Sequence, residues 1–520
     1  MAEPQFPPSV DAASAAQAIK AFEAALGADA VFFDDLDRDA YRDKFAIDDT
    51  KHIPLGAIAP GGAEEVQAAV RIANDYKIPL WPISRGKNLG YGASAPQLSG
   101  SVVLDLSRMR KIEIDEENGV ALLEPGVGFY DLYDYLQANK IKLWMSVPGN
   151  SWGSVVGNAL DRGVGYTTYG DHAAQIHGLE VVLPDGELVR TGMGAMEGSP
   201  NWNIHPYGFG PGWDQMFCQS NFGVVTKMGL WMMPEPESVY GLDMEFPEEN
   251  DLEWVVDLLA KFRREKLVQQ APSIGSWLRG AAVLTTRSEW QDDKGPLTDA
   301  TVAAIRERFN IGWWSANIRF YGYEGVNAAA AKTVKDAFNG RKLQSIKETA
   351  WRQGEPLEKS AWVGVPITFP LQNANWHGGR GGHVGYSPAL PANGRRALDQ
   401  FKRTKALYDE YGLDYHGSFA LGERHITNVN QVLFDKDNPD MMGRVDGFFR
   451  ALVADAWKQG YGEYRTHLDY MDLVASTFDF NDYALLRLNE KVKNALDPNG
   501  VIAPGKSGIW PARLAGERKQ

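Results

Sequence analysis

A glycine-rich stretch at residues 375–388, NWHGGRGGHVGYSP, surrounds two histidines and an arginine that could act on a bound molecule. These side chains are His377, Arg380 and His383. Glycine loses more conformational freedom on folding than other residues, so it is used where the backbone bends tightly or approaches another group closely. The stretch therefore predicts that a histidine is presented to a large, flat partner. Its five glycines are Gly378, Gly379, Gly381, Gly382 and Gly385.

A second glycine-rich loop, SRGKNLGYGASAP at residues 84–96, lies between two predicted strands. Backbone amides freed by glycines can form a concave nest that binds phosphate oxygens. The loop is not a P-loop, because no GK[ST] opens a helix, and it lacks the GxGxxG fingerprint of a Rossmann βαβ unit. Taken alone, it is equally compatible with a tight turn and with a phosphate site.

The composition is typical of a well-packed globular enzyme. The 520 residues exceed what one ordinary core accommodates, so we expect two or three domains. The net charge of −14 argues against a nucleic-acid partner and against a polybasic membrane anchor. Cys218 is the only cysteine, which excludes intrachain disulfides and thiolate metal clusters, and we expect no metal. The N-terminus has no basic region and no long apolar run, so we expect a cytoplasmic protein.

The hydrophobic periodicity predicts helices at residues 10–26 and 63–75, and a hairpin whose turn lies at 184–186. A proline break at 234–236 predicts a domain boundary. The chain beyond it carries longer amphipathic helices separated by strand-like pieces, and the last segment returns to a helix and a Gly/Pro loop. This pattern indicates an α+β protein.

Further short motifs recur along almost the whole chain. They are EPGV (124–127), GSVVGNALDRGVGYTTYGDH (153–172), PYGFGP (206–211), GHVGYSP (382–388), YGEYRTH (461–467) and LDPNGVIAPGKSGIW (496–510). As a set they resemble the vanillyl-alcohol oxidase and p-cresol methylhydroxylase flavoprotein family, and most of all its bacterial eugenol oxidases. The resemblance implies a two-domain α+β fold. Residues 1–238 would form the FAD-binding domain, 239–460 the cap (substrate) domain, and 461–520 would complete the active site and the FAD-binding domain.

The resemblance also implies which residues hold FAD. The pyrophosphate would lie against the first glycine loop, and the segments that follow would line the remainder of the cofactor. Lys506 would stand near the flavin N1–C2 carbonyl, where a cation stabilises the reduced anionic flavin. The other residues expected at FAD are Ser84, Arg85, Gly86, Lys87, Asn88, Leu89, Gly90, Pro125, Gly149, Ser154, Gly157, Asn158, Gly163, Gly165, Tyr166, Gly223 and Val224.

His383 occupies the position at which histidine-linked members of the family bond covalently to the flavin 8α carbon. The branch that is linked through tyrosine places that tyrosine before an Asn-Trp pair, where this chain has Ala374. The resemblance therefore implies an 8α-histidyl FAD held by His383. Two alternatives stay open: His377 could be the anchor, or His383 could be an ordinary loop histidine bonded to the backbone.

Tyr91, Tyr464 and Arg465 fall on family positions that bind the phenolic oxygen of the substrate. An arginine and two hydroxyls are donors that favour phenolate over phenol. The phenolate would then push electrons through the ring, a hydride would leave the para benzylic carbon, and a p-quinone methide would result. The alternative is that the tyrosines are half-buried core residues and that Arg465 belongs to a surface ion pair.

The chain departs from the family near the substrate. Relatives carry an aspartate after the proline where this chain has Gly149, and a His-His pair where it has Thr427 and Asn428. We expect His425 to replace the missing base. Small residues in a pocket leave room for large ligands, which predicts bulky, lignin-derived phenols. The residues expected to line the substrate pocket are Ser387, Ser418, Ala420 and Thr427.

These observations predict an FAD enzyme that oxidises para-substituted phenols and passes the electrons to O2, giving H2O2. One alternative keeps the reaction but passes the electrons to a cytochrome c. Another is a non-redox, ether-lipid-type transferase or a sugar or hydroxy-acid oxidase on the same fold, which the grouping of Tyr91, Tyr464 and Arg465 disfavours. The segment at residues 192–211 is short where octameric relatives carry an insertion, so we expect a homodimer.

Overall fold

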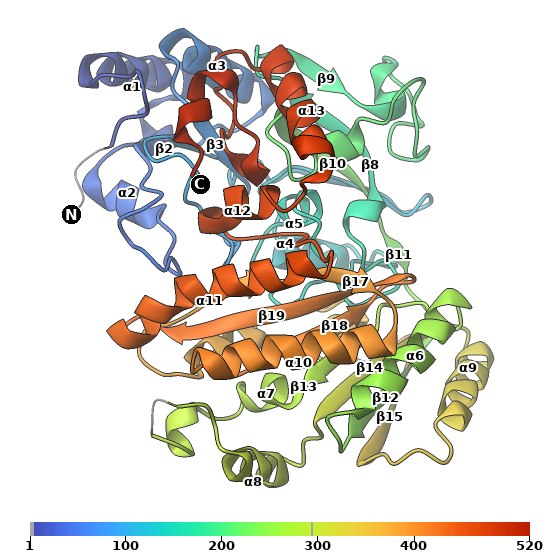
Figure 1. Ribbon diagram of the computed structural model, residues 1–520. Helices are drawn as coiled ribbons and strands as arrows, with labels where there is room; N and C mark the ends of the chain where they lie inside the picture. The colour runs from blue at the N-terminus through green and yellow to red at the C-terminus, as the bar shows by residue number, and fades with distance from the viewer. Residues whose placement is uncertain (1–4, 293–294, 520) are drawn as a thin grey trace.

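The computed structural model describes residues 5–292 and 295–519, which form an upper and a lower body in the view of Figure 1. The upper body holds a four-stranded sheet in the order β1-β2-β4-β3, in which β2 and β3 run parallel to β4. Its strands are β1 (Val31–Phe32), β2 (Gly56–Ile58), β3 (Leu80–Ile83) and β4 (Val102–Asp105). The helices of this region are α1 (Ala12–Leu26), α2 (Asp35–Ala40) and α3 (Ala63–Tyr76). Both helices expected from the periodicity, α1 and α3, are confirmed.

A five-stranded antiparallel sheet, in the order β5-β6-β10-β8-β9, completes the upper body. The predicted hairpin is formed by its strands β8 and β9, and Gly186 takes the positive φ of 86° that the turn requires. The elements are β5 (Ile112–Asp115), β6 (Val120–Leu123), α4 (Phe129–Ala138), α5 (Val155–Leu160), β8 (Ile176–Val182), β9 (Leu188–Arg190) and β10 (Val224–Trp231). The short strands β7 (Leu143–Trp144) and β11 (Met233–Pro234) pair with each other.

The lower body is built on one large sheet in the order β15-β12-β14-β13-β18-β19-β16, with β17 paired to β19. Figure 1 shows α10 and α11 lying across β18 and β19. The strands are β12 (Ser238–Phe246), β13 (Ser273–Ser276), β14 (Trp314–Gly322), β15 (Ser345–Arg352), β16 (Gly381–Tyr386), β17 (Ala389–Pro391), β18 (Gly417–Leu421) and β19 (His425–Asp435). The helices are α6 (Asp251–Arg264), α7 (Trp277–Ala281), α8 (Asp299–Phe309), α9 (Glu324–Ala337), α10 (Gly394–Glu410) and α11 (Pro439–Lys458).

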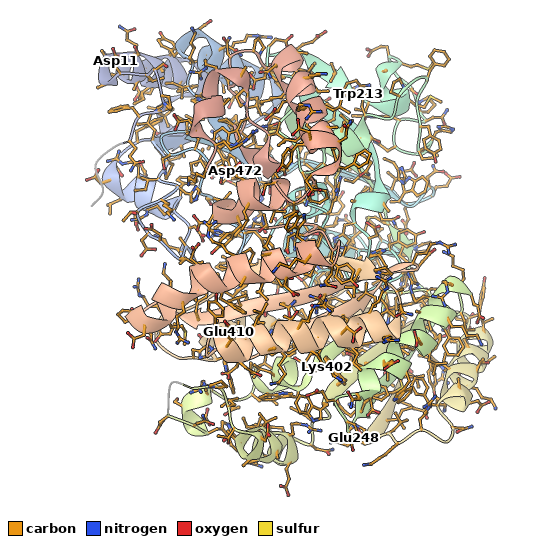
Figure 2. All side chains as sticks on the ribbon, in the orientation of Figure 1. Asp11, Trp213, Glu248, Lys402, Glu410 and Asp472 are labelled. Atoms are coloured by element: carbon orange, nitrogen blue, oxygen red, sulfur yellow. The ribbon has the colours of Figure 1, made fainter. Side chains whose placement is uncertain are left out.

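The chain returns to the upper body after residue 460, through α12 (Met471–Ala475) and α13 (Phe480–Leu496). The amide of Leu80 donates to the carbonyl of Val501 at 2.7 Å, and the amide of Ala503 donates to the carbonyl of Leu80 at 2.8 Å. The Trp510 indole donates to Asp472, labelled in Figure 2, at 2.7 Å. The first and last parts of the sequence therefore share one hydrophobic core, and the mixture of helices and sheets confirms the α+β class. Over the described residues, no helix is both long and apolar enough to cross a bilayer.

Candidate active site

A cavity of about 410 Å³ draws its walls from both bodies and from the C-terminal segment. The first glycine loop, α5 and the start of β10 contribute from the upper body, and β16 and β19 contribute from the lower one. The predicted site residues that line this cavity are Ser84, Gly86, Lys87, Asn88, Leu89, Tyr91, Pro125, Gly149, Ser154, Gly157, Asn158, Tyr166, Gly223, Val224, His383, Arg465 and Lys506.

The first glycine loop bends in a way that other residues would resist. Gly86, Gly90 and Gly92 have φ values of 62°, 81° and 115°, in the region that favours glycine. A Cβ at Gly90 would stand 2.6 Å from His383 Nε2, so glycine allows this loop to approach the histidine. The Ser154 hydroxyl donates to Ser84 at 2.7 Å and ties the loop to the start of α5. Backbone amides in such a glycine turn beside a cavity can bind phosphate oxygens, as the expected FAD site requires.

His383 lies on β16 opposite Leu433 of β19 and lines the cavity. Burial lowers the pKa of His383 to about 4, and the neighbouring His467 cation adds to this effect while Asp43 opposes it. The imidazole is therefore neutral near pH 7 and keeps a nitrogen lone pair. His377, the rival anchor, does not line the cavity. The position and protonation of His383 fit an attachment to the edge of a flavin.

The glycines of residues 375–388 serve packing as well as flavin access. A Cβ at Gly381 would stand 1.8 Å from the carbonyl of Ala374, and one at Gly382 would stand 2.7 Å from the Phe434 ring. At Gly385 a Cβ would meet the Tyr91 hydroxyl at 2.4 Å. Close contacts within the protein therefore explain more of these glycines than access to a flat partner does.

A buried network of acids and histidines lies beside His383, and the sequence analysis assigned it no role. His467 donates to Asp43 at 2.8 Å and lies 3.4 Å from one carboxylate oxygen of Asp469. The other oxygen of Asp469 is 3.1 Å from His52. Burial alone would lower the pKa of His467, but hydrogen bonds and charge from Asp43 and Asp469 raise it to about 9. The HLD sequence at 467–469 is the only local signal of this network, because Asp43 is 424 residues away.

Arg465 projects into the cavity between two aromatic rings. Its guanidinium carbon lies 4.2 Å from the ring centroid of Tyr91 and 5.5 Å from that of Tyr464. Among the described residues, no carboxylate lies within ion-pair distance of Arg465, and its buried Nε has no hydrogen-bond partner. Burial raises the pKa of Tyr464 to about 12, so this hydroxyl stays protonated. The cation is therefore left available for a ligand oxyanion.

Gly149 lies against Tyr166, whose hydroxyl would be 2.9 Å from a Cβ at that position. An aspartate there would displace Tyr166, which packs edge-on against Trp362 with ring centroids 4.6 Å apart. Tyr166 therefore fills part of the space in which relatives are expected to hold a carboxylate.

Some predicted residues do not line the cavity. His425 is exposed at the first position of β19, four residues before Val429, where this strand reaches the cavity wall. Arg85 forms an ion pair with Asp131 at 2.7 Å instead of facing the cavity. The structure brings neither His425 nor Arg85 into the wall. The remaining residues outside the wall are Gly90, Gly163, Gly165, Ser387, Ser418, Ala420, Thr427 and Tyr464.

Several residues of the wall were not predicted from the sequence. They share no motif, and strand pairing and loop packing bring them together. They are Asp161, Gln219, Arg279, Asn373, Asn430 and Gln431.

The raised pKa of His467 predicts a pH-dependent stability. A group whose folded pKa exceeds its unfolded value stabilises fully below the unfolded value, about 6.5, and loses that contribution as pH rises through the folded value, about 9. We expect His467→Gln to lower the thermal midpoint most at pH 6, and we expect the difference from wild type to shrink between pH 6.5 and 9. The exposed His205→Gln is the control, with no such trend. A difference that grows with pH would contradict the assignment.

Comparisons with known proteins agree with this site. Residues 54–192 match a family model described as FAD binding domain, and residues 323–507 match one described as FAD linked oxidases, C-terminal domain. The chain is 36% identical over 502 residues to the 4-cresol dehydrogenase [hydroxylating] flavoprotein subunit of Pseudomonas putida, which covers 95% of each chain.

Two solved structures have the same fold over nearly their whole length. The 4-ethylphenol oxidase of Gulosibacter chungangensis, in its isoeugenol complex, superposes with a TM-score of 0.93 at 35% identity, covering 98% of this chain and 100% of the other. Substrate-bound p-cresol methylhydroxylase gives a TM-score of 0.92 at 34% identity, with 97% and 99% covered. The chain therefore belongs to the vanillyl-alcohol oxidase and p-cresol methylhydroxylase family of flavin-dependent, phenol-oxidising enzymes.

Proposed function

We propose that this enzyme removes a hydride from the benzylic carbon of para-substituted phenols through a p-quinone methide. The observation that carries the proposal is Arg465, a guanidinium in the cavity wall beside the rings of Tyr91 and Tyr464, with no carboxylate of the described residues within ion-pair distance. A cation and a hydroxyl donor, here Arg465 and Tyr91, stabilise a phenolate at this position. Residues 1–238 and 461–520 are assigned to the FAD-binding part, and residues 239–460 to the cap.

In this mechanism, Arg465 and Tyr91 bind the phenolic oxygen and favour its loss of a proton. The negative charge on that oxygen then delocalises through the ring, which weakens the benzylic C–H bond para to it. The first glycine loop and Lys506, which line the cavity, would help to hold FAD, and FAD would supply a two-electron acceptor. The substrate loses its phenolic proton and one hydride, which carries two electrons, so the neutral p-quinone methide is left for water or proton loss to resolve.

Arg465→Ala should lower kcat/KM for 4-ethylphenol by about 10- to 100-fold, the loss expected for a charge-assisted hydrogen bond to a buried oxyanion. Arg424→Ala, which removes an exposed arginine, is the matched control and should change the rate little. The O-methyl ether of 4-ethylphenol cannot ionise and should not be oxidised. Equal rates for the phenol and its ether in the wild type would refute the phenolate mechanism.

We also propose that His383 bonds covalently to the flavin. The support is its neutral imidazole in the cavity wall and its contact with the glycine loop at Gly90. Acid-precipitated wild-type protein should stay yellow, whereas His383→Ala should release its FAD into the supernatant. His377→Ala serves as the control and should keep the flavin. A colourless precipitate from fully loaded wild-type protein, or loss of the bond only in His377→Ala, would contradict the assignment.

We propose O2 as the electron acceptor, and a cytochrome c remains the alternative. The similarity to an oxidase at a TM-score of 0.93 supports O2, and the similarity to a dehydrogenase subunit supports the alternative. Enzyme reduced with 4-ethylphenol under anaerobic conditions should regain its oxidised flavin spectrum when O2 is admitted, with one H2O2 formed per flavin. Fast reoxidation by cytochrome c combined with slow reoxidation by O2 would reverse this choice.

We also propose a homodimer and a preference for bulky, lignin-derived phenols. Exposed apolar side chains support association, since Phe209 and Phe480 are 108% and 87% exposed. Ser418, Ala420 and Thr427 do not line the cavity, so the substrate preference rests on Gly149 alone. Tyr166 fills part of the space beside Gly149 and limits the room gained there.

A further inference from the structure

Four cationic side chains line the cavity, and the function proposed above employs three of them. Lys506 forms an ion pair with Asp161 at 3.1 Å. Lys87 belongs to the loop assigned to the FAD phosphates, and Arg465 is the cation of the phenolate site. The fourth, Arg279, has no role in the hydride transfer.

Arg279 belongs to α7 on the cap, directly after β13. Its Nη1 donates to the hydroxyl of Ser418. Within residues 5–292 and 295–519, no carboxylate lies within ion-pair distance of its guanidinium, although arginine keeps its proton in proteins. Arg279 is half-buried, and an anionic ligand in the cavity would form a charge-assisted contact with it.

The groups around Arg279 do not supply a negative charge. Burial lowers the pKa of His416 well below its usual value, and the charge of Arg279 lowers it further, so this imidazole is neutral. Burial raises the pKa of Tyr415, so its hydroxyl stays protonated. Arg279 is therefore surrounded by neutral groups on the protein side.

Unsatisfied acceptors lie in the same part of the wall. Ser418 of β18 neighbours Gly417, which pairs with Asn430 of β19. The side-chain oxygens of Asn430 and Asn373 are buried and have no hydrogen-bond partner among the described residues, and both residues line the cavity. These amide oxygens accept hydrogen bonds, so they suit a donor on a ligand, and a ligand carboxylate in this region must be held by Arg279.

The sheet places Arg279 at some distance from the phenolate site. Tyr91 touches Gly385 of β16, which pairs with Gln431 of β19, and Ser418 lies one strand further along the sheet. Two strand spacings correspond to roughly 10 Å. A para substituent of a few carbon atoms, on a phenol bound at Arg465, spans that length.

We propose that Arg279 binds a carboxylate at the end of the substrate's para substituent, so that the preferred substrates are phenols with an acidic side chain. This inference rests on the proposed function, because it places the phenol oxygen at Arg465. Arg279 then acts as a specificity residue: it holds the far end of the substrate and takes no part in the hydride transfer.

The test compares ω-(4-hydroxyphenyl)alkanoates of two to five carbons with the corresponding carboxamides, which have the same shape without the charge. We expect wild-type enzyme to prefer at least one acid over its amide by about tenfold or more in kcat/KM, as a charge-assisted contact implies. Arg279→Gln should abolish this acid-to-amide ratio, and Arg279→Lys should retain part of it. Because the ratio is taken within each variant, a general loss of activity cancels.

Arg308→Gln, which removes an exposed arginine on α8 of the same cap, is the matched control and should keep the wild-type ratio. Wild-type enzyme that oxidises the phenols but shows no acid preference at any chain length would overturn the inference alone. The same holds if Arg279→Gln keeps the preference. Failure of every phenol, including 4-ethylphenol, to reduce the flavin would overturn the proposed function itself.

Discussion

The site depends on one electrostatic constraint, which is the positive charge of Arg465 held in a cavity with no carboxylate of the described residues within ion-pair distance of it. Burying an unpaired ion is expensive, and the faces of two tyrosine rings offset only part of the cost. The positive charge of Arg465 can therefore be balanced by a ligand oxyanion. A phenol bound here is stabilised in its ionised form, which is the form that can release a hydride from its para position.

The short segment 463–467 connects this charge to both bodies of the molecule. Glu463 accepts a hydrogen bond from the amide of Ser387 on the cap at 2.5 Å, and burial raises its pKa well above the usual value. Two residues later Arg465 enters the cavity, and after two more His467 bonds Asp43 of the N-terminal region. One short piece of chain therefore joins the cap, the phenolate site and the charged network beside His383.

Neighbouring ionisable groups around the cavity also differ in their protonation states. The neutral imidazole of His383 and the cationic His467 are close neighbours, and they differ because only His467 has two carboxylates beside it. On the cap side, Arg279 carries charge among neutral groups. Local environment decides the protonation of each group more than residue type does.

The sequence by itself determined the features that depend on local backbone. The glycine loop at 84–92, the hairpin turn at Gly186 and the helices α1 and α3 follow from residue types and periodicity, since positive φ angles and amphipathic faces are local requirements. The motif set along the chain also identified the family. These signals sufficed for the α+β class and for most of the cavity wall near the expected FAD.

Only the tertiary structure decided which distant residues meet. Strand register places Val429 and Gln431 in the wall and leaves His425 exposed, because a strand reaches the cavity along only part of its length. Arg279 reaches the cavity from a cap helix that carries no recognisable motif. Asp43 and His467 meet across 424 residues. Contacts of this kind depend on the packing of whole sheets, which no short stretch of sequence encodes.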